Sequence, residues 1–124
     1  MNEEYAVERF VRIPLTPVPA TQQVLLPAPL TSGYSYQNAP TGGLRLRRLD
    51  IINNVNTNIV ITLYDYGATP SGLNYIPVAM FTIPYTQAMA SFTFEREHGY
   101  IFSTEIAASA NISGVYISAI VELE

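Results

Sequence analysis

Apolar and polar residues alternate along much of the chain, which predicts β-strands. In the C-terminal segment 115–123 the odd positions are all apolar, and the even positions include Tyr, Ser and Glu. The same period of two recurs in segments 59–64 and 91–97. This alternation places one side of a strand against a core and the other toward solvent. Weaker strand patterns cover 8–13, 22–26 (a short edge strand), 73–83 (interrupted by Pro77) and 100–105, and no segment has the spacing of an amphipathic helix.

One of the stronger strand patterns changes its parity part-way along. Leu44 and Leu46 share one face, whereas the next apolar candidates, Leu49 and Ile51, fall on the opposite parity. One additional residue in the strand restores the register, so we predict a β-bulge at Arg47–Arg48.

Turn-forming residues separate these segments and support hairpins. Asparagines within 53–58 separate two strong strands, and Asn tolerates left-handed turn conformations. The run 97–100 resembles a two-residue hairpin loop, with Gly99 at a positive φ and His98 in a left-handed turn position. A further turn at 111–114 precedes the last strand. About seven or eight short strands at this spacing predict a single all-β domain, an antiparallel β-sandwich of the jelly-roll kind.

Residues 14–43 differ in composition from the rest of the chain. Six of the nine prolines lie there, among Thr, Ser, Ala and Gln. Proline fixes φ and lacks a backbone donor, so this stretch is predicted to be extended and to supply only edge strands. We therefore divide the domain into an acidic N-terminus with a Pro-rich arm, 1–43, and a sandwich core, 44–124. The arm either follows its own domain or lies across a neighbouring subunit, and its length favours the second.

Charged residues are few. Asp, Glu, Lys and Arg make up 13% of the chain, against about 25% in a typical soluble domain. A free monomer normally covers its surface with mixed charges, so the low content predicts that other protein molecules cover part of the exterior. A surface of uncharged polar residues is the alternative. All six basic residues are Arg, which suits interface ion pairs and is equally explained by a coding bias.

Several classes of function are disfavoured by the same composition. The net charge of −4 argues against nucleic-acid binding, which depends on neutralising phosphates. No apolar run reaches the roughly 18 residues that span a bilayer. The N-terminus lacks the order of a signal peptide, so we expect cytoplasmic synthesis and a soluble product. The absence of Cys excludes disulfides and thiolate metal sites.

Few residues could take part in catalysis or metal binding. His98 is the single histidine, and Asp50 and Asp65 are the only aspartates. Asp65 opens a turn-rich loop, 65–72, and is predicted to cap a turn because calcium needs several oxygens at close spacing. We predict no catalytic residue, no cofactor and no metal site, and therefore no enzyme. An enzyme ranks third among the functional interpretations of this sequence.

The candidate interface residues come from the arm and from a basic cluster. Nine tyrosines and no tryptophan suit protein interfaces and also sugar-binding platforms. Clustered arginines in an acidic protein are predicted to pair with carboxylates of the same or an adjacent chain. The candidates are Leu25, Leu26, Tyr34, Tyr36, Arg45, Arg47 and Arg48.

The acidic start with its Pro-rich arm, the strand segments 44–53 and 58–65, and the regular C-terminal strand cover most of the chain. Together they resemble small virion structural proteins of tailed bacteriophages, of the kind that decorate or cement a capsid. The resemblance implies a β-sandwich that forms trimers or similar rings and binds the major capsid protein or other virion proteins at the capsid surface, after synthesis in the host cytoplasm. A carbohydrate-binding sandwich, with exposed tyrosines and an Asp or Asn in a loop, is the alternative.

Overall fold

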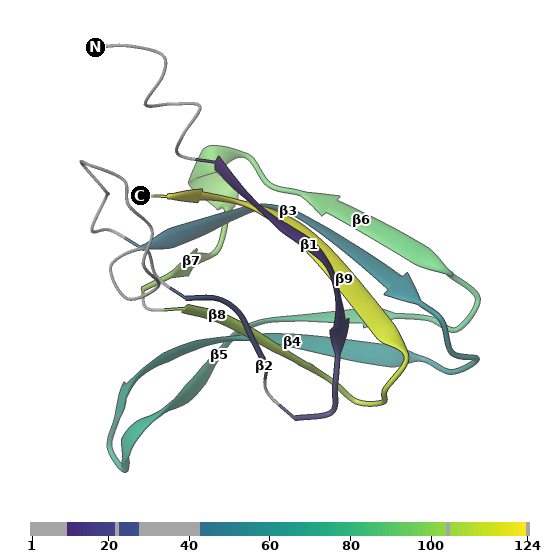
Figure 1. Ribbon diagram of the computed structural model, residues 1–124, viewed down its shortest axis with the longest axis horizontal. Helices are drawn as coiled ribbons and strands as arrows, with labels where there is room; N and C mark the ends of the chain where they lie inside the picture. The colour runs from purple at the N-terminus through teal and green to yellow at the C-terminus, as the bar shows by residue number, and fades with distance from the viewer. Residues whose placement is uncertain (1–9, 22, 28–42, 104, 124) are drawn as a thin grey trace.

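The computed structural model of the protein describes residues 10–21, 23–27, 43–103 and 105–123 (Figure 1). Within these ranges the chain is all-β, as the alternation predicts. The strands are β1 (Phe10–Val18), β2 (Gln23–Pro27), β3 (Leu44–Asn53), β4 (Ile59–Thr69), β5 (Gly72–Ile83), β6 (Met89–Thr93), β7 (Ile101–Phe102), β8 (Glu105–Ala110) and β9 (Val115–Leu123), and a 3-10 turn, η1 (Arg96–His98), lies between β6 and β7.

The strands form two antiparallel sheets that face each other as the layers of a sandwich (Figure 1). One sheet has the order β1-β9-β3-β6, with β7 paired to β3, and the other has the order β2-β8-β4-β5. The β4–β5 connection is a hairpin within one sheet, whereas the turns before β4 and before β9 carry the chain from one sheet to the other. The expectation of hairpins at these two turns is therefore wrong, because sheet membership is set by long-range pairing.

The predicted bulge in β3 is confirmed. The register between β3 and β9 shifts between Leu46 and Arg48. Leu44 and Leu46 before the shift, and Leu49 and Ile51 after it, are all buried. The extra residue lets both halves of the strand present leucine and isoleucine to the same core.

The inward side chains of the two sheets form one core. Odd positions of β9 from Val115 to Leu123 are buried, and Ile59, Ile61 and Leu63 of β4 meet them from the other sheet. Each such aliphatic side chain contributes about 1.5–3 kcal/mol on burial. On the side where β5 faces β6, the ring centroids of Phe81 and Phe92 are 5.0 Å apart. This contact covers the core between the two edge strands.

Proline marks three of the four sheet edges. Pro14 and Pro17 lie in β1, Pro27 ends β2, and Pro77 lies in β5. The register of β5 shifts beside Pro77. Proline and bulges blunt an edge against pairing with another chain. β1 continues to Val18, so the start of the predicted arm belongs to an edge strand; residues 28–42 lie outside the described residues, and the division at residue 43 stays a prediction.

Two loop predictions are wrong. Residues 65–69 belong to β4, and only Pro70 and Ser71 form the turn before β5. At the end of β6, η1 replaces the expected two-residue hairpin loop. Gly99 has φ −77, and no non-glycine residue in the described ranges has a positive φ, so His98 is not left-handed. Glycine is required at position 99 because a Cβ there would overlap the carbonyl oxygen of Leu46.

Candidate interaction face

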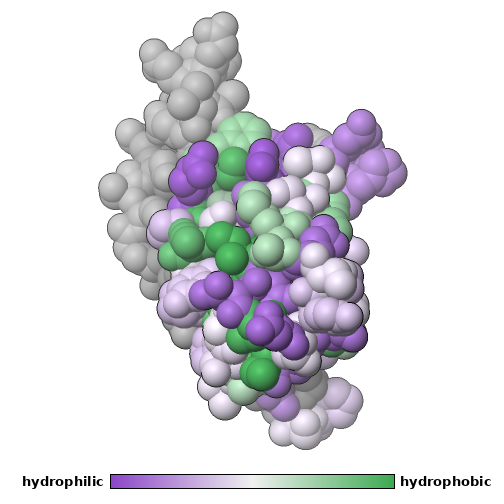
Figure 2. Space-filling model, turned by 90° about the vertical axis from the view of Figure 1, so that its right-hand side faces the viewer, coloured by the Kyte–Doolittle hydropathy of each residue, from purple (hydrophilic) through white to green (hydrophobic). Residues whose placement is uncertain are grey.

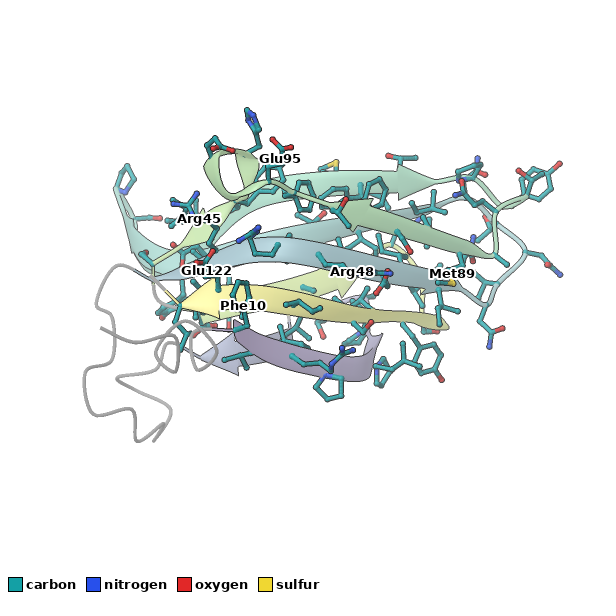
Figure 3. The ribbon with its side chains drawn as sticks, turned by 90° about the horizontal axis from the view of Figure 1, so that it is seen from above. Phe10, Arg45, Arg48, Met89, Glu95 and Glu122 are labelled. Carbon is teal, nitrogen blue, oxygen red and sulfur yellow. The ribbon has the colours of Figure 1, made fainter. Side chains whose placement is uncertain are left out.

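The outward side of the five-stranded sheet gathers most of the arginines. The register places Arg12 of β1 and Arg48 of β3 on either side of Ile120 of β9. In the next outward row along β9, Phe10 and Arg45 flank Glu122 in the same way. Phe10, Arg45, Arg48 and Glu122 are seen together on this side in Figure 3. We call this surface the outer face; the bulge adds Arg47 to it.

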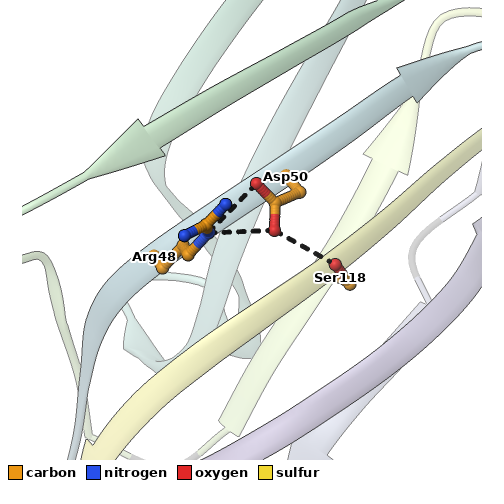
Figure 4. Close-up of polar contacts among 3 residues, drawn as sticks. All are labelled: Arg48, Asp50 and Ser118. Carbon is orange, nitrogen blue, oxygen red and sulfur yellow. Dashed lines mark hydrogen bonds and ion pairs between the residues drawn. The ribbon is translucent and has the colours of Figure 1, made fainter.

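A shallow cleft of about 250 Å³ lies in the outer face. It is lined by Arg12, Arg48, Asp50, Ser118, Ala119 and Ile120. The Arg48 Nε donates to both carboxylate oxygens of Asp50, at 3.2 and 3.1 Å. The Ser118 hydroxyl donates to the same carboxylate at 3.4 Å (Figure 4). One side of the cleft is thus an ordered ion pair between neighbouring outward positions of β3.

The Asp50 carboxyl is held in its ionised form. Burial raises its pKa, but hydrogen bonds from Ser91, Arg48 and Ser118 and the positive charge of Arg48 lower it by more, so the pKa lies below its ordinary value. Hydrogen bonds to the charged form of a carboxyl favour that form. At neutral pH the cleft therefore contains two guanidinium groups and one carboxylate.

Arg47, the bulge residue, makes the second ion pair of the face. Its Nη1 lies 2.7 Å from Oε1 of Glu122, and its Nε donates to the carbonyl oxygen of Phe94 at 3.0 Å. The guanidinium carbon is 5.7 Å from the centroid of the Phe10 ring. A pair this close, with the Glu122 side chain only 10% exposed, joins β3 to β9, and the bond to Phe94 joins β3 to the segment that follows β6.

Apolar side chains lie at the two ends of the outer face. Phe10 and Ile101 are 45% and 47% exposed at one end, and Met89 is 54% exposed at the other. Phe10 and Met89 lie far apart along the sheet in Figure 3. On the end of the molecule seen in Figure 2, apolar groups are small and separated by polar ones. The outer face thus has a charged centre between apolar ends.

Charge is unevenly distributed between the outer face and the rest of the chain. The face holds Arg12, Arg45, Arg47 and Arg48 against Asp50 and Glu122, a net charge of +2. The whole chain carries −4, so the other residues sum to −6, of which −3 belongs to residues 1–9 and 124, outside the described ranges. The described residues outside the face, Asp65, Glu95, Arg96, Glu97 and Glu105, therefore sum to −3, opposite in sign to the face.

Part of the negative charge lies at the rim of the five-stranded sheet. Glu95, Glu97 and His98 are exposed in and beside η1, and their potential ligand atoms all lie within 4.8 Å of one another. We call Glu95 and Glu97 the acidic corner. Exposed acidic groups commonly cluster without a metal ion, and nothing else in the described residues points to a ligand there.

Sequence reasoning anticipated part of this face. The structure brings Arg45, Arg47 and Arg48 together, and Arg47 and Arg48 pair with carboxylates of their own chain. Arg12 was missed, because its position opposite Ile120 depends on the pairing of β1 with β9. Leu25 is half-buried in β2, and Leu26 lies in β2 with its side chain outside the described set. Tyr34 and Tyr36 lie outside the described residues, so their interface role stays a prediction.

Asp65 lies within β4 and not at the start of a loop, and its carboxylate caps the connection between β7 and β8 instead of a turn of its own segment. One of its carboxylate oxygens accepts hydrogen bonds from the backbone N–H and the hydroxyl of Ser103, at 2.8 and 2.6 Å. The other accepts from the N–H of Tyr66 at 2.8 Å and of Glu105 at 3.4 Å. The carboxylate thus ties the β7–β8 connection to β4.

Three tyrosines pack beside this turn. The rings of Tyr66 and Tyr75 meet edge to face with centroids 5.1 Å apart, and Tyr64 and Tyr75 do so at 6.1 Å. Burial raises the pKa of Tyr75, and the charge of Glu105 and a hydrogen bond to it act in the same direction. Edge-to-face contacts at these distances stabilise the three rings as one cluster.

No protein-family model and no curated protein matches the chain. Among solved structures, it is similar to a chain described under the words "Bacillus endospore appendages form a novel family of disulfide-linked pili". The two chains share 14% identity over 92% of this chain and 84% of that chain, with a TM-score of 0.44. A similarity at this level does not assign a function, and the present sequence has no cysteine. In the described part of the chain, no helix has the length and apolarity to cross a membrane.

Proposed function

We propose that this protein is a non-catalytic structural protein that assembles with further copies of itself through the outer face of the five-stranded sheet. The observation that carries the proposal is the segregation of charge among the described residues, with +2 on the outer face and −3 on the others. Copies of such a molecule attract one another when the face of one meets the acidic surface of the next.

Exposed apolar side chains at the ends of the face support the same proposal. Phe10, Met89 and Ile101 are each about half exposed, at 45%, 54% and 47%. Burying them in a contact removes apolar surface from water, at about 25 cal/mol per Å². The low content of charged residues, 13%, favours an exterior that is partly covered by neighbours.

The finer proposal is a virion structural protein of the capsid-decorating kind, a homotrimer on the capsid surface. The strand order β1-β9-β3-β6 opposite β2-β8-β4-β5 supports it, because we interpret this order as a jelly roll, an architecture used by viral capsid and lectin domains. Fold alone does not define function. Against the carbohydrate-binding alternative, the Asp65 carboxylate already accepts hydrogen bonds from Ser103 of its own chain.

Sedimentation velocity of the full chain over a range of concentrations tests the proposed assembly. We expect a mass above that of one chain at micromolar concentration, and a trimer if the finer proposal holds. A chain that stays monomeric up to millimolar concentration contradicts self-assembly. Co-sedimentation with purified capsids tests the capsid partner separately: decoration predicts saturable binding, and the absence of binding removes that part of the proposal.

A further inference from the structure

The cleft of the outer face has the composition of a binding site for one carboxylate. Arg12 and Arg48 lie on strands either side of Ile120, so their Cα atoms are separated by two strand spacings, about 10 Å. Both line the same cleft, with Ile120 between them. Two long side chains directed to one space can hold a single group between them.

Both arginines have guanidinium N–H groups that are available to a further acceptor. In the described part of the chain Arg12 makes no hydrogen bond and no ion pair, and Arg48 uses only its Nε, on Asp50. The Arg48 side chain is 45% exposed. With Asp50 ionised, the cleft carries one net positive charge. A guanidinium offers a planar pair of donors that matches a carboxylate, so a single carboxylate neutralises the cleft.

The chain itself contains exposed carboxylates that suit this cleft. Glu95 and Glu97 of the acidic corner are exposed, and no hydrogen bond or ion pair engages their carboxylates within the described residues. The corner follows β6, at one edge of the sheet, whereas Arg12 lies on β1 at the opposite edge. Figure 3 shows Glu95 on the β6 side, well away from Phe10 on β1.

We propose that the Arg12–Arg48 cleft binds the acidic corner of a second copy of this chain. The inference deepens the proposed self-assembly and rests on it. Because the two surfaces are different, each molecule offers one cleft and one corner, and the contact is head to tail. A contact of this kind closes into a ring if its rotation permits, and otherwise propagates as a filament. The contact between corner and cleft sets the head-to-tail orientation of neighbouring copies. The apolar side chains at the ends of the outer face add buried area to it.

Complementary charge reversal tests the contact. The first variant is Arg12→Glu, on an exposed edge-strand residue. The second is Glu95→Arg with Glu97→Arg; Glu95 makes no side-chain capping bond to η1, so the turn should persist. Thr82→Glu, exposed on the other sheet, is the control. Each full-length protein is checked for native circular dichroism and thermal midpoint, and its association constant is measured by sedimentation velocity.

We expect each reversal alone to weaken association about tenfold or more. The equimolar mixture of the two variants should recover most of it in a filament or an even-membered ring, where the variants alternate, and two of the three contacts in a trimer. In the mixture, the reversed cleft meets the reversed corner, and the native cleft meets the native corner. Thr82→Glu should leave association within about twofold of wild type. Raising the salt to about 1 M, where the Debye length falls to about 3 Å, should weaken the wild-type contact.

Other outcomes overturn the proposal in distinguishable ways. If both variants associate as wild type does, the cleft and corner are not the contact, while self-assembly itself stands. If both are weakened and the mixture recovers nothing, the loss reflects total charge and the specific pairing is wrong. If wild type is monomeric throughout, the proposed function fails together with this inference.

Discussion

Replacing Gly99 by alanine tests how closely the turn after β6 is packed against β3. The backbone N–H of Leu46 donates to the carbonyl oxygen of Tyr100 at 2.8 Å. A Cβ on residue 99 would overlap the carbonyl oxygen of Leu46 and lie 3.0 Å from Cγ of Arg45. The φ of −77 suits any residue, so the whole cost of Gly99→Ala is steric.

The expected loss of stability in Gly99→Ala follows from the backbone and side-chain atoms that must move. Displacing the 99–100 backbone loses the hydrogen bond between Leu46 and Tyr100, about 0.5–1.5 kcal/mol. Disturbing the packing around fully buried Leu46 costs about 1–3 kcal/mol more. We therefore expect Gly99→Ala to lower the free energy of unfolding by about 2–4 kcal/mol. For a domain of this size that is a fall in the thermal midpoint of roughly 8–15 °C.

Gly72→Ala is the matched control, because it separates steric from conformational cost. Gly72 has φ +118 and no atom within 4 Å of a Cβ, so alanine there costs only the backbone strain, about 1–2 kcal/mol. Urea unfolding followed by circular dichroism gives both free energies. If Gly99→Ala costs no more than Gly72→Ala, the close approach of residue 99 to β3 is wrong.

Three further predictions concern the core, one outward hydrogen bond and the cleft. Phe102→Ala, at a fully buried site, should lower the free energy of unfolding by about 3–5 kcal/mol in urea titrations; a loss below 1 kcal/mol would contradict the burial. Tyr64→Phe removes the 2.8 Å hydrogen bond to the Ser109 hydroxyl and should cost about 1 kcal/mol by calorimetry, whereas no loss would contradict that bond. Asp50 has a lowered pKa in the folded protein, so its stabilising effect is complete above about pH 4 and is lost as the pH falls from there through the lowered pKa. The free energy of unfolding of Asp50→Asn should therefore fall less steeply than that of wild type as the pH is lowered. An unchanged dependence on pH would show that the Arg48 and Ser118 contacts do not stabilise the carboxylate.

The local sequence pattern was sufficient to predict the strands that have one buried side. In β9, and in β3 around its bulge, the parity of apolar residues follows directly from which side faces the core. These features depend on the immediate neighbours along the chain.

The errors share a different cause, namely contacts between distant segments. Gly99 looks like a turn glycine with a positive φ, but its role is close approach to β3, more than fifty positions earlier in the sequence. Residues 65–69 are the exception: they carry turn-type Asp and Gly but continue β4, because they pair with residues 72–76 of β5 across a two-residue turn. The cleft needs β1, β9 and β3 in one register, so the meeting of Arg12 with Arg48 could not be predicted from spacing.

If copies associate through the outer face, that face is buried in the assembly, and protection of a thiol placed on it measures this burial. Because the sequence contains no cysteine, a single introduced Cys reports on one place. Thr93→Cys lies on the outer face beside Arg48, and Thr82→Cys lies on the opposite sheet; both positions are exposed. The rate of maleimide labelling of each full-length variant is compared at dilute and at high protein concentration. We expect labelling at position 93 to slow at high protein concentration, where copies associate, and labelling at position 82 to stay unchanged. Equal labelling rates of position 93 at both concentrations, or protection of position 82 alone, would contradict burial of the outer face.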